Sequence, residues 1–166
     1  MTQTAKFALS LAVALAASQD LGAAEVSARA GASLTLTDGA AANQANKFFA
    51  DTRTIAASGT DTLDLVGTLT DTFGALINFT KIKAIVVVAR GANVNDVVIG
   101  GAVANGFVSP FGAATDKVKV KPGGAFAIFA PDVNGYAVTA ATADLLQIAN
   151  SAAGTSVTYD IVIVGV

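Results

Sequence analysis

Three aspartates in the middle of the chain come closest, by residue type and spacing, to a catalytic site. Asp61 and Asp64 lie in "GTDTLDL", and Asp71 lies in "LTDTFG". A pair of carboxylates is sufficient for glycoside hydrolysis. On a strand, however, residues three apart point to opposite faces, so Asp61 and Asp64 are poorly placed for shared chemistry. Aspartate also favours turns, where it accepts hydrogen bonds from backbone amides, and we expect that role for all three.

The composition excludes the commonest catalytic and metal-binding arrangements. The chain has no cysteine and no histidine, so thiol nucleophiles, zinc-thiolate sites and serine–histidine pairs are absent. The stretch "DVNG" over 132–135 is similar to the start of a calcium loop, but Glu25 is the only glutamate and lies far from it. We therefore predict no catalytic residue, no cofactor and no metal, and expect that the protein is not an enzyme.

Four phenylalanines offer a different kind of site, a stacking platform for sugar rings. They are Phe107, Phe111, Phe126 and Phe129. Phenylalanine is more often a core residue, and a chain without tryptophan has few aromatics suited to carbohydrate. The sequence favours core positions for the four, while a secreted adhesin or carbohydrate-binding module stays open as an alternative function.

Charge and hydropathy point towards other protein chains as partners. Charged residues make up 13% of the chain and the net charge is −2, which gives no basic surface for nucleic acid. Hydrophobic residues reach 53%, and the mean hydropathy of +0.61 is high for a soluble monomer. No apolar run reaches the roughly 18 residues of a membrane-spanning helix. We expect a homo-oligomer with no nucleic-acid or membrane partner.

From about residue 54 the chain alternates between short strands and turns. This spacing predicts an all-β fold, an antiparallel β-sandwich or jelly roll of about 8–9 strands. The lysines of "DKVKVK" alternate with valines, which indicates a strand with one wet face that resists edge aggregation. The apolar end, "YDIVIVGV", is typical of a strand at the centre of a sheet. The candidate strands are 62–67, 75–80, 82–90, 96–101, 116–121, 124–130, 136–140, 144–150 and 157–166.

Residues 1–50 have too few large apolar side chains for a core of their own. We predict an extended N-terminal arm over 1–50, with one or two strands, and a sandwich domain over 51–166. The segment 6–20 has two interpretations: a signal peptide, or a strand in which large apolar residues alternate with alanine and serine. The single lysine before the apolar run makes the strand more plausible. The segment 38–53 is expected to be a polar loop or short helical turn.

Residues from about 49 to 166 carry a set of motifs that resembles small structural proteins of tailed bacteriophages. The motifs are "DLVGTLTDTFG", "FTKIKAI", an asparagine-rich turn, "PGG", "GYAVTA" and "SVTYDI". The resemblance implies a role in the virion and no catalysis. By analogy with small sandwich or jelly-roll proteins, it also implies a decoration or cement protein, commonly a trimer, which is assembled in the host cytoplasm and binds the major capsid protein. A tail, tail-tip or head-fibre protein is the close alternative.

An arm whose apolar side chains alternate with small residues can add to a neighbouring sheet. We therefore expect the arm to bridge neighbouring subunits together with the flanks of the sandwich. The predicted contact residues are Phe7, Leu9, Leu11, Val13 and Leu15 of the arm, with Phe48 and Phe49 at its junction with the body.

Overall fold

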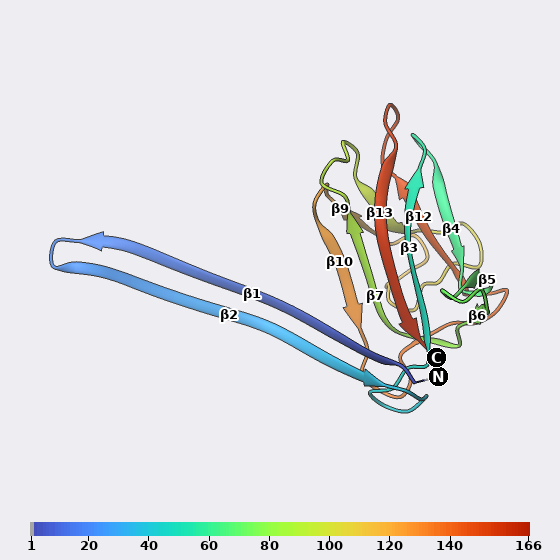
Figure 1. The fold of residues 1–166 in the computed structure, drawn as a ribbon. Helices are drawn as coiled ribbons and strands as arrows, with labels where there is room; N and C mark the ends of the chain where they lie inside the picture. Colours follow the sequence, from blue (N-terminus) through green and yellow to red (C-terminus); the bar gives the residue numbers. More distant parts are fainter. Residues whose placement is uncertain (1) are drawn as a thin grey trace.

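A computed structural model describes residues 2–166, which form strands and no helix (Figure 1). The all-β fold predicted from the strand and turn pattern is confirmed. Within these residues, no helix is long and apolar enough to cross a membrane. The chain has two parts of different shape: a body of stacked sheets built from about residue 47 onward, and a long N-terminal hairpin that projects from the foot of the body.

The body is a sandwich of two main sheets in which every pair of neighbouring strands is antiparallel. The first sheet has the order β10 (Ala125–Phe129), β7 (Lys81–Ala89), β13 (Val157–Gly165) and β3 (Lys47–Ile55), with β11 (Tyr136–Ala137) also paired to β7. The second has the order β4 (Thr60–Asp64), β12 (Leu145–Asn150), β8 (Val97–Gly100) and β9 (Lys117–Val120). A separate ribbon joins β5 (Val66–Thr70) to β6 (Leu76–Asn78).

The order of the strands within the two sheets shows how the chain connects them. When the strands of the four-strand paths β10-β7-β13-β3 and β4-β12-β8-β9 are counted in chain order, the sheets read 6-3-8-1 and 2-7-4-5. Strands adjacent in the sequence therefore mostly lie in opposite sheets. We infer a jelly-roll connection from this order, since the double-sheet jelly roll has eight strands joined as two Greek keys.

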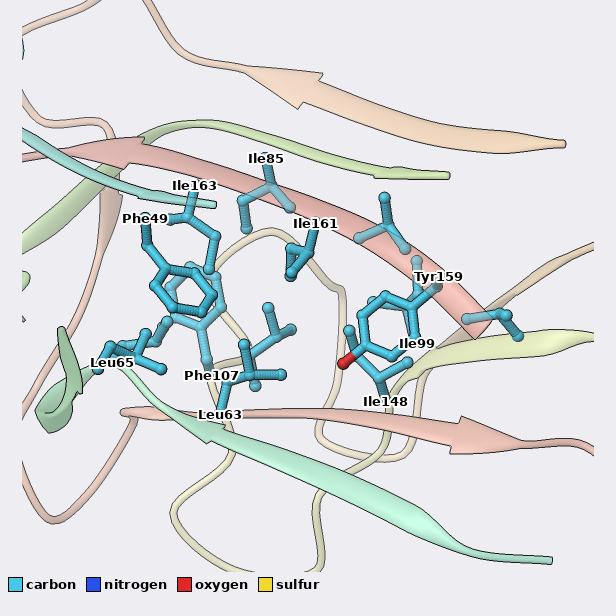
Figure 2. Packing of buried hydrophobic residues seen from close by; sticks show 14 of the residues in the cluster. Phe49, Leu63, Leu65, Ile85, Ile99, Phe107, Ile148, Tyr159, Ile161 and Ile163 are labelled. Carbon is cyan, nitrogen blue, oxygen red and sulfur yellow. The ribbon is translucent and has the colours of Figure 1, made fainter. Parts of the chain in front are cut away.

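The core lies between the two sheets (Figure 2). Alternate residues of β13 point into it, and Tyr159, Ile161 and Ile163 are almost fully buried. Leu63 and Ile148 meet them from the second sheet. Each such aliphatic side chain contributes about 1.5–3 kcal/mol when it is fully buried, so the alternation in the sequence fixes which face of each strand turns inward.

Two detailed predictions about the body strands are confirmed. β13 pairs with β7 on one side and β3 on the other, so the apolar end of the chain lies inside a sheet. β9 is the edge strand of its sheet, with Lys117, Lys119 and Lys121 exposed and Val120 buried. The lysines thus lie where an unpaired edge would otherwise be free to recruit another chain.

The hairpin, which we call the arm, consists of β1 (Thr4–Gln19) and β2 (Gly22–Thr37). The strands pair along all 16 residues, and Asp20 and Leu21 form the turn. At about 3.4 Å per residue, the arm is roughly 50 Å long. Figure 1 shows it leaving the foot of the body, close to both termini of the chain.

The arm and the body divide the chain earlier than the sequence indicated. The hairpin ends at Thr37, and β3, which begins at Lys47, already belongs to the body because it pairs with β13. The expectation of a loop or helical turn over 38–53 is wrong for its second half, which is strand. In β3 the apolar residues Phe49 and Ile55 face inward, while polar residues between them obscure the alternation in the sequence.

Candidate interaction surface

One face of the arm is apolar along its whole length. The pairing register places Leu9 opposite Ala32, Leu11 opposite Ala30 and Val13 opposite Ala28. Partners in an antiparallel pair point to the same side of the sheet, so large side chains from β1 and small ones from β2 share one surface. In register, this apolar face pairs Ala5, Phe7, Leu9, Leu11, Val13, Leu15 and Ala17 with Leu36, Leu34, Ala32, Ala30, Ala28, Val26 and Ala24.

The opposite face of the arm is polar or small. It carries Ser10, Ser27, Glu25 and Arg29, with alanines between them. The arm is therefore amphipathic, yet beyond its root no residue of the described range 2–166 covers the apolar side. Leu9, Leu11, Val13, Leu15 and Val26 are each more than half exposed to solvent.

The root of the arm is anchored to the body through the same apolar face. Leu34 and Leu36 are buried against Ala84 of β7 and Val164 of β13. Phe7 packs on Phe129 of β10, with ring centroids 4.6 Å apart and planes tilted by 51°. The arm therefore rests on the outer face of the first sheet, the face turned away from the core, before it leaves the body.

A groove of about 600 Å³ lies beside this root. Its floor is the outer face of the first sheet, where Val86, Val162 and Phe48 come from three neighbouring strands. Phe73 and Leu76, from the ribbon of β5 and β6, form a further wall and are largely exposed. The root itself lines the groove, so the apolar surface continues from the body onto the arm.

The structure separates the seven predicted contact residues into three groups. Leu9, Leu11, Val13 and Leu15 lie on the exposed apolar face of the arm. Phe7 is partly buried at the root, and Phe48 is 38% exposed in the groove. Phe49 has to be corrected, because it is only 6% exposed and packs in the main core. Adjacent strand residues face opposite sides, so Phe48 and Phe49 could not both have faced a partner.

Sequence reasoning missed the contribution of β2 and of the groove walls. The segment 22–37 alternates Ala24, Val26, Ala28, Ala30, Ala32, Leu34 and Leu36 with residues that are mostly small and polar. That period of two was the available signal, although alanine and glycine are weak strand formers. Phe73 and Leu76 carried no periodic signal, because they flank a turn.

Asp61, the first of the three candidate carboxylates, forms a structural ion pair and not the predicted turn. Its Oδ1 accepts from Arg53 Nη2 at 3.0 Å, and its Oδ2 accepts from the Tyr159 hydroxyl at 2.8 Å. Burial acts to raise the pKa of Asp61, but the hydrogen bonds from Arg53 and Tyr159 outweigh burial and lower it. Burial, and then the bond to Asp61, raises the pKa of Tyr159. The carboxylate is thus held ionised and already paired.

The remaining aspartates of interest act in turns, as predicted. Asp64 Oδ1 accepts from the amide of Val66, and Asp71 Oδ1 accepts from the amides of Phe73 and Ala75. In "DVNG", the amides of Asn134 and Gly135 donate to Asp132 and lower its pKa. Among residues 2–166, no group of three acidic, histidine or cysteine side chains is placed to hold a metal.

The four phenylalanines considered for carbohydrate stacking pack inward or against the arm. Phe107 is buried in the main core, and Phe111 and Phe126 pack against it. Phe129 is the residue on which Phe7 rests. The described part of the chain therefore offers no row of exposed aromatic rings at these positions, and the arm with its groove is the candidate functional surface.

Comparison with known protein families, with curated proteins and with solved structures finds no match to this chain.

Proposed function

We propose that the protein is a structural component of a tailed-bacteriophage virion, most specifically a capsid decoration or cement protein. The observation that carries this proposal is a rigid sandwich bearing a roughly 50 Å arm with one uncovered apolar face. An isolated two-stranded hairpin is marginally stable in water, and a large exposed apolar strip marks an interaction site. The class of assembly in this proposal comes from the resemblance of the motifs in residues 49–166 to small phage structural proteins.

The proposed mechanism is bridging. The body supplies rigidity through paired backbone hydrogen bonds and a single buried core. The arm carries an apolar face away from the body, and the groove lined by Phe48, Val162 and Phe73 offers a second apolar contact at the root. A subunit with contacts at both places can link neighbours in the particle, including the major capsid protein, without any catalytic step.

The first test is the protein content of purified particles. Mass spectrometry should detect the chain in many copies per particle, and cryo-electron microscopy should place it on the capsid surface. Density at the tail, the tail tip or a head fibre would move it to another part of the virion. Absence from the particle would contradict the proposal.

The second test removes the free part of the arm and keeps its root. Because Ser10 pairs with Gly31, replacing residues 11–30 by Asn-Gly leaves a hairpin with a favoured two-residue turn. The root contacts of Phe7 and Leu34 stay intact. The shortened protein should melt at the same temperature as the wild type and should fail to bind particles that lack the protein.

A further inference from the structure

The free part of the arm, residues 9–32, exposes an apolar side that an apolar partner surface would cover. That side of the arm is built from five apolar pairs, from Leu9 with Ala32 to Ala17 with Ala24, and carries no charge. The inference below rests on the proposed role of the arm as a connector and identifies the surface that it contacts.

We propose that the apolar face of the arm packs on the same face of the arm of a second copy of this chain. Each apolar face would then cover the other. The large residues of β1 and the alanines of β2 from both copies would form a small two-layer sandwich between the subunits. Sheets packed face to face lie about 10 Å apart and bury exactly such alternating positions.

The first argument for a second copy is continuity with an interface that the chain already makes. At the root, Phe7, Leu34 and Leu36 of this face are packed against another sheet, the outer face of the body. The free part continues the same alternation of apolar and small residues along β1, where Leu9, Leu11 and Val13 take the place that Phe7 has at the root. A face that packs on a sheet at one end is suited to pack on a sheet over the rest of its length.

The second argument is area. The five large residues of the free part are 53–72% exposed, and with the alanines beside them they present roughly 500–700 Å² of surface on each arm. Two arms would bury roughly 1,000–1,400 Å², which reaches the size of specific protein interfaces. The arm of a second copy is therefore large enough to cover the face, and it is present wherever the protein is.

The third argument is that the positions of the charged residues favour burial of the apolar face, and not of the opposite face, when two arms pack together. Glu25 and Arg29 both lie on the opposite face, so face-to-face packing leaves them in water. Pairing of arm edges, the other route to self-association, would place residues of both faces next to a neighbour. The two arrangements therefore differ in which side chains approach one another.

The chain's lack of cysteine permits a direct test with single-cysteine variants. Leu11→Cys, Val13→Cys and Leu15→Cys place a thiol on the apolar face, and Ala12→Cys, Ala14→Cys and Ala16→Cys are matched controls on the opposite face. Oxidation or a short bis-maleimide should link the first set into covalent dimers, the largest product that one cysteine per chain allows, and should leave the second set without cross-links. Equal linking of both sets would indicate edge pairing and overturn the proposal.

Sedimentation of the full chain gives an independent measurement. The wild type should exceed the monomer mass, and the double variant Leu11→Ser with Leu15→Ser should raise the dissociation constant by at least about 100-fold. Ala12→Ser with Ala14→Ser should leave the constant unchanged, and circular dichroism should show all three proteins folded. A wild type that is monomeric at micromolar concentration would overturn the proposal.

These measurements separate the inference from the proposed function. A monomeric chain that still binds particles would refute arm-to-arm packing and leave the virion role in place. A chain that self-associates but is absent from particles would refute the virion role and leave arm-to-arm packing in place.

Discussion

Three side chains from different strands, Arg53, Asp61 and Tyr159, tie the two sheets of the body together. Arg53 and Tyr159 belong to the first sheet and Asp61 to the second. The carboxylate accepts from both partners, so it stays ionised while partly buried, and hydrogen bonding to Asp61 raises the pKa of Arg53. Asp61, which the sequence offered as a candidate catalytic carboxylate, thus stabilises the fold.

Asp61→Asn should lower the free energy of unfolding at pH 7 by about 1–2 kcal/mol, a modest figure because Arg53 is partly exposed. The folded-state pKa of Asp61 lies below its ordinary value of 3.8, so its stabilisation is present above that pH and is lost as the pH falls through the folded value. Urea unfolding across the acid range should show the difference between variant and wild type shrinking below about pH 4. Asp51→Asn, which removes only the more exposed ion pair, should cost less than about 0.5 kcal/mol.

Gly165 is a residue whose lack of a side chain permits close packing at the end of β13. It lies at a register shift in β13, next to Val164, on which the arm root rests. A Cβ at this position would collide with the carbonyl oxygen of Lys81 and with the ring of Phe79. The backbone of the neighbouring strand cannot move aside as a flexible side chain could.

Gly165→Ala should therefore destabilise the body by about 1–3 kcal/mol, the usual cost of overpacking. Thermal unfolding followed by circular dichroism would measure it. Gly91→Ala is the matched control, since its Cβ would meet only the Cα of Gly123 at 4.0 Å. Equal melting temperatures for the two variants would contradict the expected collision.

Among the elements, the arm combines a docked root with a free outer part. Within residues 2–166, the outer parts of β1 and β2 pair only with each other, so their stability should be low and local. The root, by contrast, shares a small cluster with the body. Phe7 and Phe129 form an aromatic contact at the edge of that cluster.

Phe7→Ala should loosen the root without unfolding the body. Loss of the aromatic contact should increase hydrogen exchange of the root amides about tenfold or more, because a loss of about 1–2 kcal/mol is expected for a partly buried ring. The melting temperature of the body should change little. Leu11→Ala, measured at the same low concentration, should leave exchange at the root unchanged; if Phe7→Ala also does, the root is not held by this contact.

Sequence patterns located eight of the nine candidate strands, because each has its own run of branched or aromatic residues bounded by turn residues. The candidate strand 62–67 is divided in the structure, where it covers the end of β4, Leu65 and the start of β5. The patterns did not reveal β3, where Asp51, Thr52 and Thr54 hide the inward positions, or the pairing of β1 with β2. Pairing is a long-range property that local propensity does not encode, and alanine gives a weak strand signal. The exposed leucines were found for the same reason as the body strands: their strict alternation.

At the scale of the whole molecule, the association of arms should depend on apolar burial and hardly on charge. The apolar face carries no ionisable residue, and the net charge of the chain is only −2. Screening by salt therefore has little to act on.

The dissociation constant measured by sedimentation should change less than about threefold between about 0.05 and 1 M sodium chloride. Sodium sulfate should tighten the association, because it strengthens apolar burial. A weakening of more than about tenfold in sodium chloride would show that ionic contacts hold the subunits together.

The central position of β13 has a consequence for synthesis. β13 follows the other strands of the first sheet in the sequence and lies between β3 and β7, so this sheet cannot close until β13 has been synthesised. The arm precedes the body in the sequence and its two strands pair with each other, so its leucines are exposed on the nascent chain before the body folds. Each nascent chain therefore exposes the apolar face of the arm before its body has folded. On the proposed model, chaperone binding or early contact with a second copy directs that face to assembly and away from aggregation.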